Sequence, residues 1–179
     1  MTKQQLFIYF LVGIMVFSAL GTGLLLLTQG TSNNSTAQTD EAQQVCQASA
    51  DVANQPGNPA GEWPTTSPDV TELQITDLRV GTGQAAAVGN CITVHYRLSL
   101  SNGTPIEGND TFESGQPIAF ELSPGGLIEG WIQGIPGLQE GGVRRLVLPP
   151  DMAYGAAERP GIPANSTLIF DVELLKVEF

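Results

Sequence analysis

The residues of this chain that could support chemistry are mostly apolar. His95 is the only histidine among the 179 residues, and alternation along its strand places it opposite Val94 and Tyr96, at the surface. A histidine-based triad and a multi-histidine metal site therefore have no support. The chain also lacks a CxxC pair, a phosphate-cradling glycine loop and two carboxylates spaced as general acid and base. We expect no metal ion and no cofactor, and bond-breaking catalysis has little support.

What the chain supplies instead is a set of large apolar residues near predicted loops, namely Tyr96, Phe112, Phe120, Trp131, Tyr154, Ile162 and Phe170. The stretch from Gly125 to Ile135 organises them, because its apolar residues recur at three-and-four spacing and predict a short helix of about two or three turns. Four glycines in this stretch leave space around Trp131. Its indole is either the floor of a pocket or simply the largest core residue of a small sheet protein.

Alternation of apolar and polar residues predicts the strands that must position this helix. They cover Leu73–Val80, Ile92–Leu100, Ile118–Leu122, Val143–Leu148 and Leu168–Val177, with a bulge near Asp77 in the first. Asn102-Gly103 predicts a hairpin turn, because both central positions of such a turn favour positive φ. We therefore expect an α+β domain in which one short helix packs across a five-stranded twisted antiparallel sheet.

The amino-terminal part of the chain has a different composition. Residues 6–27 form a run of 22 residues without a charge, long enough at about 1.5 Å per residue to cross a hydrocarbon core of about 30 Å. We interpret this run as a transmembrane signal anchor, and a cleaved signal peptide that leaves a secreted protein is the alternative. Lys3, in the short segment 1–5, favours a cytoplasmic amino terminus and puts the rest of the chain outside the cytoplasm.

Residues 28–70 contain five acids and no base, and they are rich in Ser, Thr, Asn, Gln, Ala and Pro. Such a segment buries too little apolar surface to offset its ordering entropy, so we expect a flexible linker followed by a folded domain at residues 71–179. The formal net charge of the chain is −11 and its basic residues are not clustered. This argues against a nucleic-acid partner, because phosphate neutralisation needs grouped Lys and Arg.

From about Leu73 to Phe179 the chain resembles the FKBP-type peptidyl-prolyl cis-trans isomerases. The resemblance rests on strings that occur in the family's order and spacing: VGTG from Val80, VHY from Val94, GGLIEGW ending at Trp131, PPDMAYG from Pro149 and IPANSTLIFDVELL from Ile162. It implies an FKBP-like sheet half-wrapped around the helix and isomerase activity on X-Pro bonds of polypeptides. It also implies binding of FK506- or rapamycin-type macrolides.

Carried over residue by residue, the resemblance implies a pocket with Trp131 as its floor. The Ile128 backbone N–H would donate a hydrogen bond to a substrate carbonyl, and the Tyr154 hydroxyl would be the second polar group. The residues implied to line this pocket are Tyr96, Phe120, Leu127, Ile128, Trp131, Tyr154, Ile162 and Phe170.

The chain departs from the family pattern at three positions. Ile106-Glu107 stands where Phe-Asp is usual, and Ile118 stands at another frequent aromatic position. The resemblance makes Glu107 a candidate catalytic residue that orients the Tyr96 hydroxyl, and makes Ile106 and Ile118 candidate substrate contacts. A longer carboxylate and smaller apolar walls could lower turnover. A proline-binding module without useful turnover is therefore a second hypothesis, and a structural surface protein with a vestigial pocket is a third.

The two cysteines, Cys46 and Cys91, are both predicted outside the membrane. Cys91 shares the outer side of its strand with Thr93 and His95. A disulfide in an oxidising compartment would clamp the predicted linker to the sheet, and two unpaired thiols are the alternative.

Overall fold

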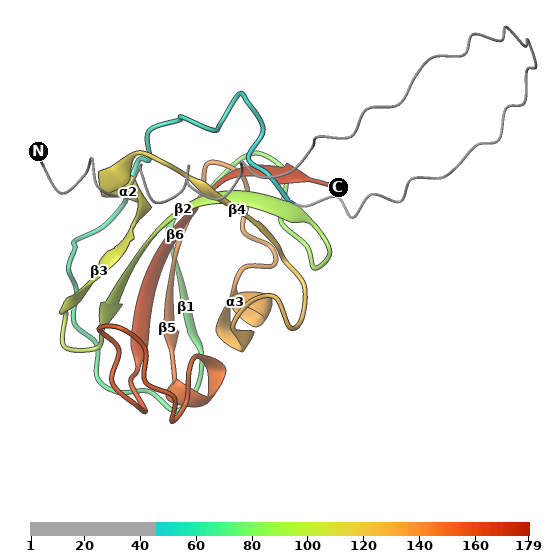
Figure 1. The fold of residues 1–179 in the computed structure, drawn as a ribbon. Helices are drawn as coiled ribbons and strands as arrows, with labels where there is room; N and C mark the ends of the chain where they lie inside the picture. Colours follow the sequence, from blue (N-terminus) through green and yellow to red (C-terminus); the bar gives the residue numbers. More distant parts are fainter. Residues whose placement is uncertain (1–45) are drawn as a thin grey trace, which may run out of the picture. The chain divides into compact units, whose positions relative to one another are not determined.

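The computed structural model describes residues 46–179, and its strands form one antiparallel sheet (Figure 1). The strands are β1 Gln74–Arg79, β2 Cys91–Leu100, β3 Pro105–Asp110, β4 Ile118–Glu121, β5 Val143–Leu148 and β6 Leu168–Glu178. They follow the order β1-β5-β6-β2-β3, and β4 also pairs with β2. The bulge predicted near Asp77 is present, because the register of β1 against β5 shifts between Asp77 and Arg79. The predicted α+β class with an antiparallel sheet is confirmed.

The prediction of five strands was wrong by one, because it missed β3. This strand contains Pro105, Gly108 and two short polar residues, all of which are depleted in strands. The chain still returns from the turn at Asn102-Gly103 to pair with β2, although the register of this pairing shifts. Gly103 has a positive φ of 85° but Asn102 does not, so the turn differs from the one predicted.

Three short helical elements complete the fold: α2 Thr111–Ser114, α3 Glu129–Gly134 and the 3₁₀ helix η1 Pro150–Met152. The predicted helix around Trp131 is α3, and it has only six residues. Two glycines let it approach β5 closely. A Cβ atom at Gly130 would collide with the Leu148 side chain, and one at Gly134 would lie 2.7 Å from a methyl carbon of Leu146. The close approach brings Trp131 into the same apolar core as the inward side chains of β2, β5 and β6.

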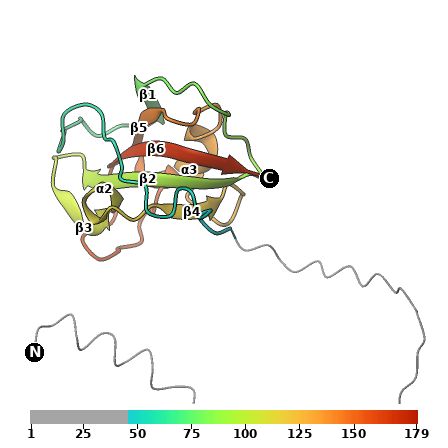
Figure 2. The same cartoon turned by 90° about the horizontal axis from the view of Figure 1, so that it is seen from above.

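Residues 46–70, which we call the strap, lie against the face of the sheet opposite to the one that α3 covers. Figure 2 shows this segment, in blue-green, beside β2 and β6. The Asn58 N–H donates to a Glu173 carboxylate oxygen at 2.7 Å, and Cys46 forms a disulfide with Cys91, their Cα atoms 5.6 Å apart. The flexible linker predicted for residues 28–70 therefore differs from the structure over residues 46–70. Sequence composition did not show that polar groups of the sheet supply partners for the strap backbone.

His95 was predicted at the surface, but it is fully buried beneath the strap. Its Nε2 lies 2.8 Å from the Gln55 carbonyl oxygen and its Nδ1 lies 3.1 Å from the Thr111 hydroxyl. Its ring stacks on Phe112 with 5.3 Å between centroids. Alternation identified the two sides of β2 correctly. It did not show that the polar side is covered as well.

The predicted anchor at residues 6–27, and the linker up to residue 45, lie outside the described residues. Within residues 46–179, no helix is long and apolar enough to cross a membrane.

Candidate active site

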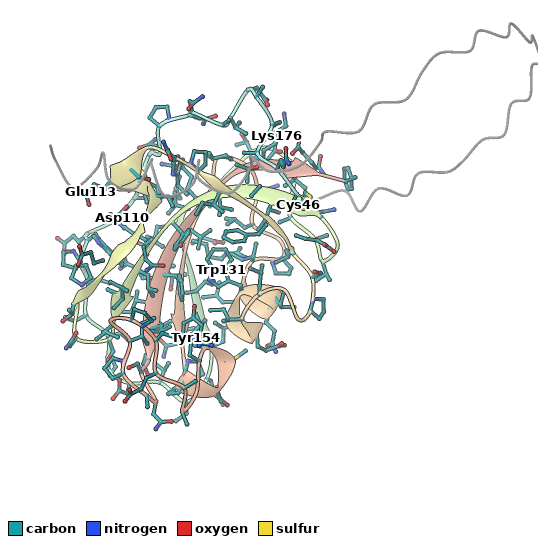
Figure 3. All side chains as sticks on the ribbon, in the orientation of Figure 1. Cys46, Asp110, Glu113, Trp131, Tyr154 and Lys176 are labelled. Carbon is teal, nitrogen blue, oxygen red and sulfur yellow. A yellow bond between two sulfur atoms is a disulfide. The ribbon has the colours of Figure 1, made fainter. Side chains whose placement is uncertain are left out.

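A pocket of about 600 Å³ lies among α3, β2, β4, β6 and the loop that follows η1. Trp131 and Tyr154, which both line it, are labelled in Figure 3. The residues that line the pocket are Tyr96, Leu98, Asn109, Phe120, Gly125, Gly126, Leu127, Ile128, Glu129, Trp131, Ala153, Tyr154, Arg159 and Phe170. The set combines aromatic and aliphatic walls with a few polar groups, as in sites that bind small apolar ligands.

Trp131 makes T-shaped contacts with three other aromatic rings. Its ring centroid lies 5.6 Å from that of Tyr96, 5.4 Å from that of Phe120 and 5.6 Å from that of Phe170, at interplanar angles between 78° and 84°. Such edge-to-face pairs are favourable arrangements of aromatic quadrupoles. Only 4% of Trp131 is exposed. The indole is therefore fixed in orientation, and the small part that is not covered faces the pocket.

Ile128 stands at the first cap position of α3, with φ −65° and ψ 147°. Its carbonyl accepts hydrogen bonds from the N–H groups of Trp131 and Ile132 at 3.0 and 3.3 Å. Its own N–H makes no hydrogen bond within residues 46–179. The first N–H groups of a helix have no partner inside the helix, and no side chain caps α3. The pocket therefore contains one backbone donor that is free to bind a ligand carbonyl.

The hydroxyl of Tyr96 donates a hydrogen bond to the Asn109 side-chain oxygen at 3.2 Å. The sequence had assigned this contact to Glu107, which is instead exposed and does not line the pocket. The irregular pairing of β3, with Gly108 at a φ of 79°, brings Asn109 rather than Glu107 to the pocket. Burial, with a smaller contribution from nearby Tyr154, raises the pKa of Tyr96, so this phenol remains a neutral donor.

The structure brings together most of the predicted pocket. Seven of the eight residues implied by the resemblance line it: Tyr96, Phe120, Leu127, Ile128, Trp131, Tyr154 and Phe170. Besides Glu107, three candidates do not line it, namely the eighth residue of that set, Ile162, and the two substrate-contact candidates Ile106 and Ile118. Ile162 and Ile106 are buried in the core at 6% and 4% exposure, and Ile118 is 39% exposed.

Sequence reasoning missed several lining residues. Leu98 lies two residues after Tyr96 on the same side of β2, so alternation could have found it. Asn109 and Arg159 lie in an irregular strand and in a loop, where no periodic signal exists. Within residues 46–179, no group of three His, Cys, Asp or Glu side chains is placed to hold a metal ion. The arrangement can enclose a flat apolar ring and bind one of its carbonyl neighbours.

Comparison with known proteins gives relatives of the same kind. The chain is 42% identical over 125 residues to FK506-binding protein 4 of Aspergillus fumigatus, covering 68% of this chain and 25% of the relative. It is 46% identical over 106 residues to an FK506-binding protein of Neisseria meningitidis, covering 59% of this chain and 95% of the relative. The chain thus spans about a quarter of the length of the first curated relatives it matches.

Solved structures and family descriptions agree with these relatives. A crystal structure of FkpA from Escherichia coli superposes with a TM-score of 0.54 at 39% identity, covering 64% of this chain and 51% of that one. The sequence pattern of the family described as FKBP-type peptidyl-prolyl cis-trans isomerase matches residues 82–175, which is more than half of the 179 residues. On this match, and on the aromatic pocket around Trp131, the chain belongs to the FKBP-type peptidyl-prolyl cis-trans isomerase family.

Proposed function

We propose that this protein isomerises X-Pro bonds of polypeptides outside the cytoplasm, from a domain tethered to the membrane by residues 6–27. The catalytic part of the proposal rests on one observation. The indole of Trp131, packed against three aromatic rings, and the free N–H of Ile128 lie in the same pocket. The indole offers a flat apolar surface for a pyrrolidine ring. The N–H offers a fixed donor for a carbonyl beside it.

The chemistry of such a pocket follows from the peptide bond. Twisting an X-Pro amide by about 90° breaks a resonance that contributes a barrier of roughly 18–20 kcal/mol. The planar amide is more dipolar than the twisted one, so an apolar enclosure that desolvates its carbonyl destabilises the planar ground state. A rate gain of about 1000-fold needs about 4 kcal/mol of this difference. No proton has to be transferred, so a site without a general base is sufficient.

The residues of the pocket take distinct roles in this proposal. Trp131 is the floor on which the proline ring lies, and the Ile128 N–H orients a substrate carbonyl. The half-buried Tyr154 hydroxyl is a second polar group, and Tyr96, held by Asn109, completes the wall. FK506- and rapamycin-type macrolides are proposed ligands of the same pocket, because the family to which the chain belongs binds them.

The free donor can be tested by removing it alone. Ile128→Pro deletes the N–H, and the φ of −65° at this position suits proline. We expect kcat/KM for a proline peptide to fall about tenfold, the upper range for loss of one hydrogen bond. Isomerisation is measured by NMR exchange, without a protease, on the full chain in detergent micelles.

Ile128→Val is the matched control, because it keeps the N–H and a branched apolar side chain. Equal activity of the two variants, with both folded by circular dichroism, would remove the proposed role of the donor. Absence of any rate above buffer in the unmodified chain would favour the hypothesis of a proline-binding module without turnover.

The membrane part of the proposal is supported by the uncharged run at residues 6–27 and by the disulfide, which suits an oxidising compartment. We expect the full chain to stay with the membrane fraction after extraction at high pH. Its release into the soluble fraction would instead favour a cleaved signal peptide and a secreted protein.

A further inference from the structure

Arg159 is the one basic residue in the described part of the chain that has no acidic partner. The other five form salt bridges: Arg79 with Glu173, Arg97 and Arg145 with Asp171, Arg144 with Asp77, and Lys176 with Asp51. Arg159 also differs from them in position, because it alone lines the pocket. Its charge is thus available to whatever the pocket binds.

The backbone holds Arg159 at a defined place on the pocket wall. Its N–H donates to the Ile162 carbonyl at 3.0 Å, and the Ile162 N–H donates back to the Arg159 carbonyl at 2.9 Å. The guanidinium carbon lies 5.4 Å from the centre of the Tyr154 ring, within the range of a cation–π contact. Among residues 46–179 the contact of the guanidinium is this one with the Tyr154 ring, so its N–H groups remain free to form a fork for a carboxylate.

The protein carries a net negative charge, so the positive charge of Arg159 stands out as a binding group for an anion. The chain has a formal net charge of −11, and Glu129 is a second charged residue that lines the pocket. The Glu129 carboxylate accepts a hydrogen bond from Gln133 at 2.8 Å. A substrate carboxylate would therefore meet repulsion from Glu129 and from the net charge of the protein, and, among the residues that line the pocket, attraction from Arg159.

We propose that Arg159 is a specificity residue that favours proline segments carrying a carboxylate within two residues of the proline. The proposal rests on the proposed function only in so far as the pocket takes proline segments. Arg159 is exposed, so its pairing with a substrate acid resembles a surface ion pair. Such pairs give a preference of roughly two- to fivefold.

The experiment compares peptides that differ only in charge. Each has blocked termini and one proline, with Glu or Gln at one of the two positions on either side of it. The dissociation constant, from calorimetry, and kcat/KM, from NMR exchange, are measured for the full chain in micelles. We expect a Glu-over-Gln preference of about two- to fivefold at one or more positions. It should approach one in 1 M salt, where the Debye length is about 3 Å.

Three variants assign the preference to Arg159. Arg159→Gln should abolish it, and Arg159→Lys should retain part of it, because the charge stays while the planar fork is lost. Glu129→Gln should increase it, since the repulsion is removed. Lys176→Gln is the matched control: it removes one positive charge at an exposed ion pair outside the pocket and should leave the preference unchanged.

A preference that is equal in the unmodified chain and in Arg159→Gln, or absent at every position, overturns the proposal. The two readouts also separate this failure from failure of the proposed function. If no peptide is isomerised but Glu peptides bind more tightly through Arg159, the specificity stands and turnover fails. If both peptides are isomerised equally, the function stands and the specificity fails.

Discussion

At the scale of single residues, the contact between Tyr96 and Asn109 decides which polar substitution should lower activity. Asn109→Ala removes the acceptor of the Tyr96 hydroxyl and leaves that phenol with one partner fewer in a half-buried site. We expect kcat/KM for a proline peptide to fall about two- to tenfold, the range for one hydrogen bond. Glu107→Ala is the comparison, and its effect should be smaller because Glu107 is exposed and outside the pocket. A larger effect of Glu107→Ala would restore the assignment made from the family pattern.

The Tyr96 phenol also predicts how the protein responds to high pH. Burial, then the proximity of Tyr154, raises the pKa of Tyr96 above its ordinary value of 10.0. As pH rises past this value, the unfolded chain releases the proton before the folded chain does, so the folded state loses stability. Below about pH 9 the phenol is neutral in both states, and activity should not depend on it.

The measurement is tyrosinate absorbance near 295 nm for the full chain and for Tyr96→Phe. The chain has three tyrosines, so the difference between the two titrations isolates one of them. Its midpoint should lie above that of free tyrosine. A midpoint at or below pH 10 would show that the Tyr96 hydroxyl is solvated.

Most of the pocket could be predicted because its residues occur in strings with fixed spacing. Trp131, Ile128 and Phe170 lie in strings that occur in the order and spacing of the family, so each can be matched to one position of the family pattern. Asn109 could not be predicted, because it lies two positions after Glu107 in a strand whose pairing is irregular. Arg159 lies in a loop, and only the folded structure shows that every other Lys and Arg of the described part is paired with an acid.

At the scale of elements, the position of α3 depends on glycines that face β5. Gly130→Ala places a methyl group against Leu148, and Leu148 is fully buried and cannot move outward. We expect the free energy of unfolding to fall by about 1–3 kcal/mol, the cost of overpacking a core. Urea unfolding of the full chain measures this change.

Gly126→Ala is the control for that substitution. A Cβ atom at Gly126 would make only an ordinary contact, 3.5 Å from the Ser123 hydroxyl, and its φ is not positive. Its stability should stay within about 0.5 kcal/mol of the unmodified chain, as for surface changes. Equal losses in the two variants would mean that contact with Leu148 does not set the cost.

The strands that sequence predicted well are those that cross the centre of the sheet. In β2 apolar and polar residues alternate from Ile92 to Leu100, and in β6 they alternate from Phe170 to Leu174, so the inward side of each strand is clear. In contrast, β3 has one buried large side chain, Ile106, and could be recognised only from its partner. The burial of His95 could not be predicted either, since it depends on the strap, which is distant in sequence and lacks a hydrophobic pattern.

At the scale of the whole molecule, the strap is ordered by polar contacts as well as by a small apolar cluster in which Trp63 and Val70 pack against Val147 and Ile169. Three arginines reach its backbone: Arg79 donates to the Asn58 carbonyl, Arg97 to that of Ala60 and Arg145 to that of Glu62. Each arginine is also bound to a carboxylate of β6, either Asp171 or Glu173. The carbonyl groups of the strap therefore accept hydrogen bonds from guanidinium groups, and the buried carboxylates of β6 hold these guanidinium groups in place. This explains how a segment of low hydrophobicity can cover a sheet.

The strap thus has a covalent attachment at its start and noncovalent contacts along its length, among them the arginine contacts, and removing the disulfide should not release the rest. Replacing both Cys46 and Cys91 with Ser should lower the free energy of unfolding by at most about 4 kcal/mol, the chain-entropy value for a loop of 45 residues. The denaturant slope should rise, because the unfolded chain without the cross-link is less compact and exposes more surface. Urea unfolding and amide exchange at Asn58, which donates to Glu173, measure both effects. Loss of protection at Asn58 in the variant would show that the disulfide alone holds the strap.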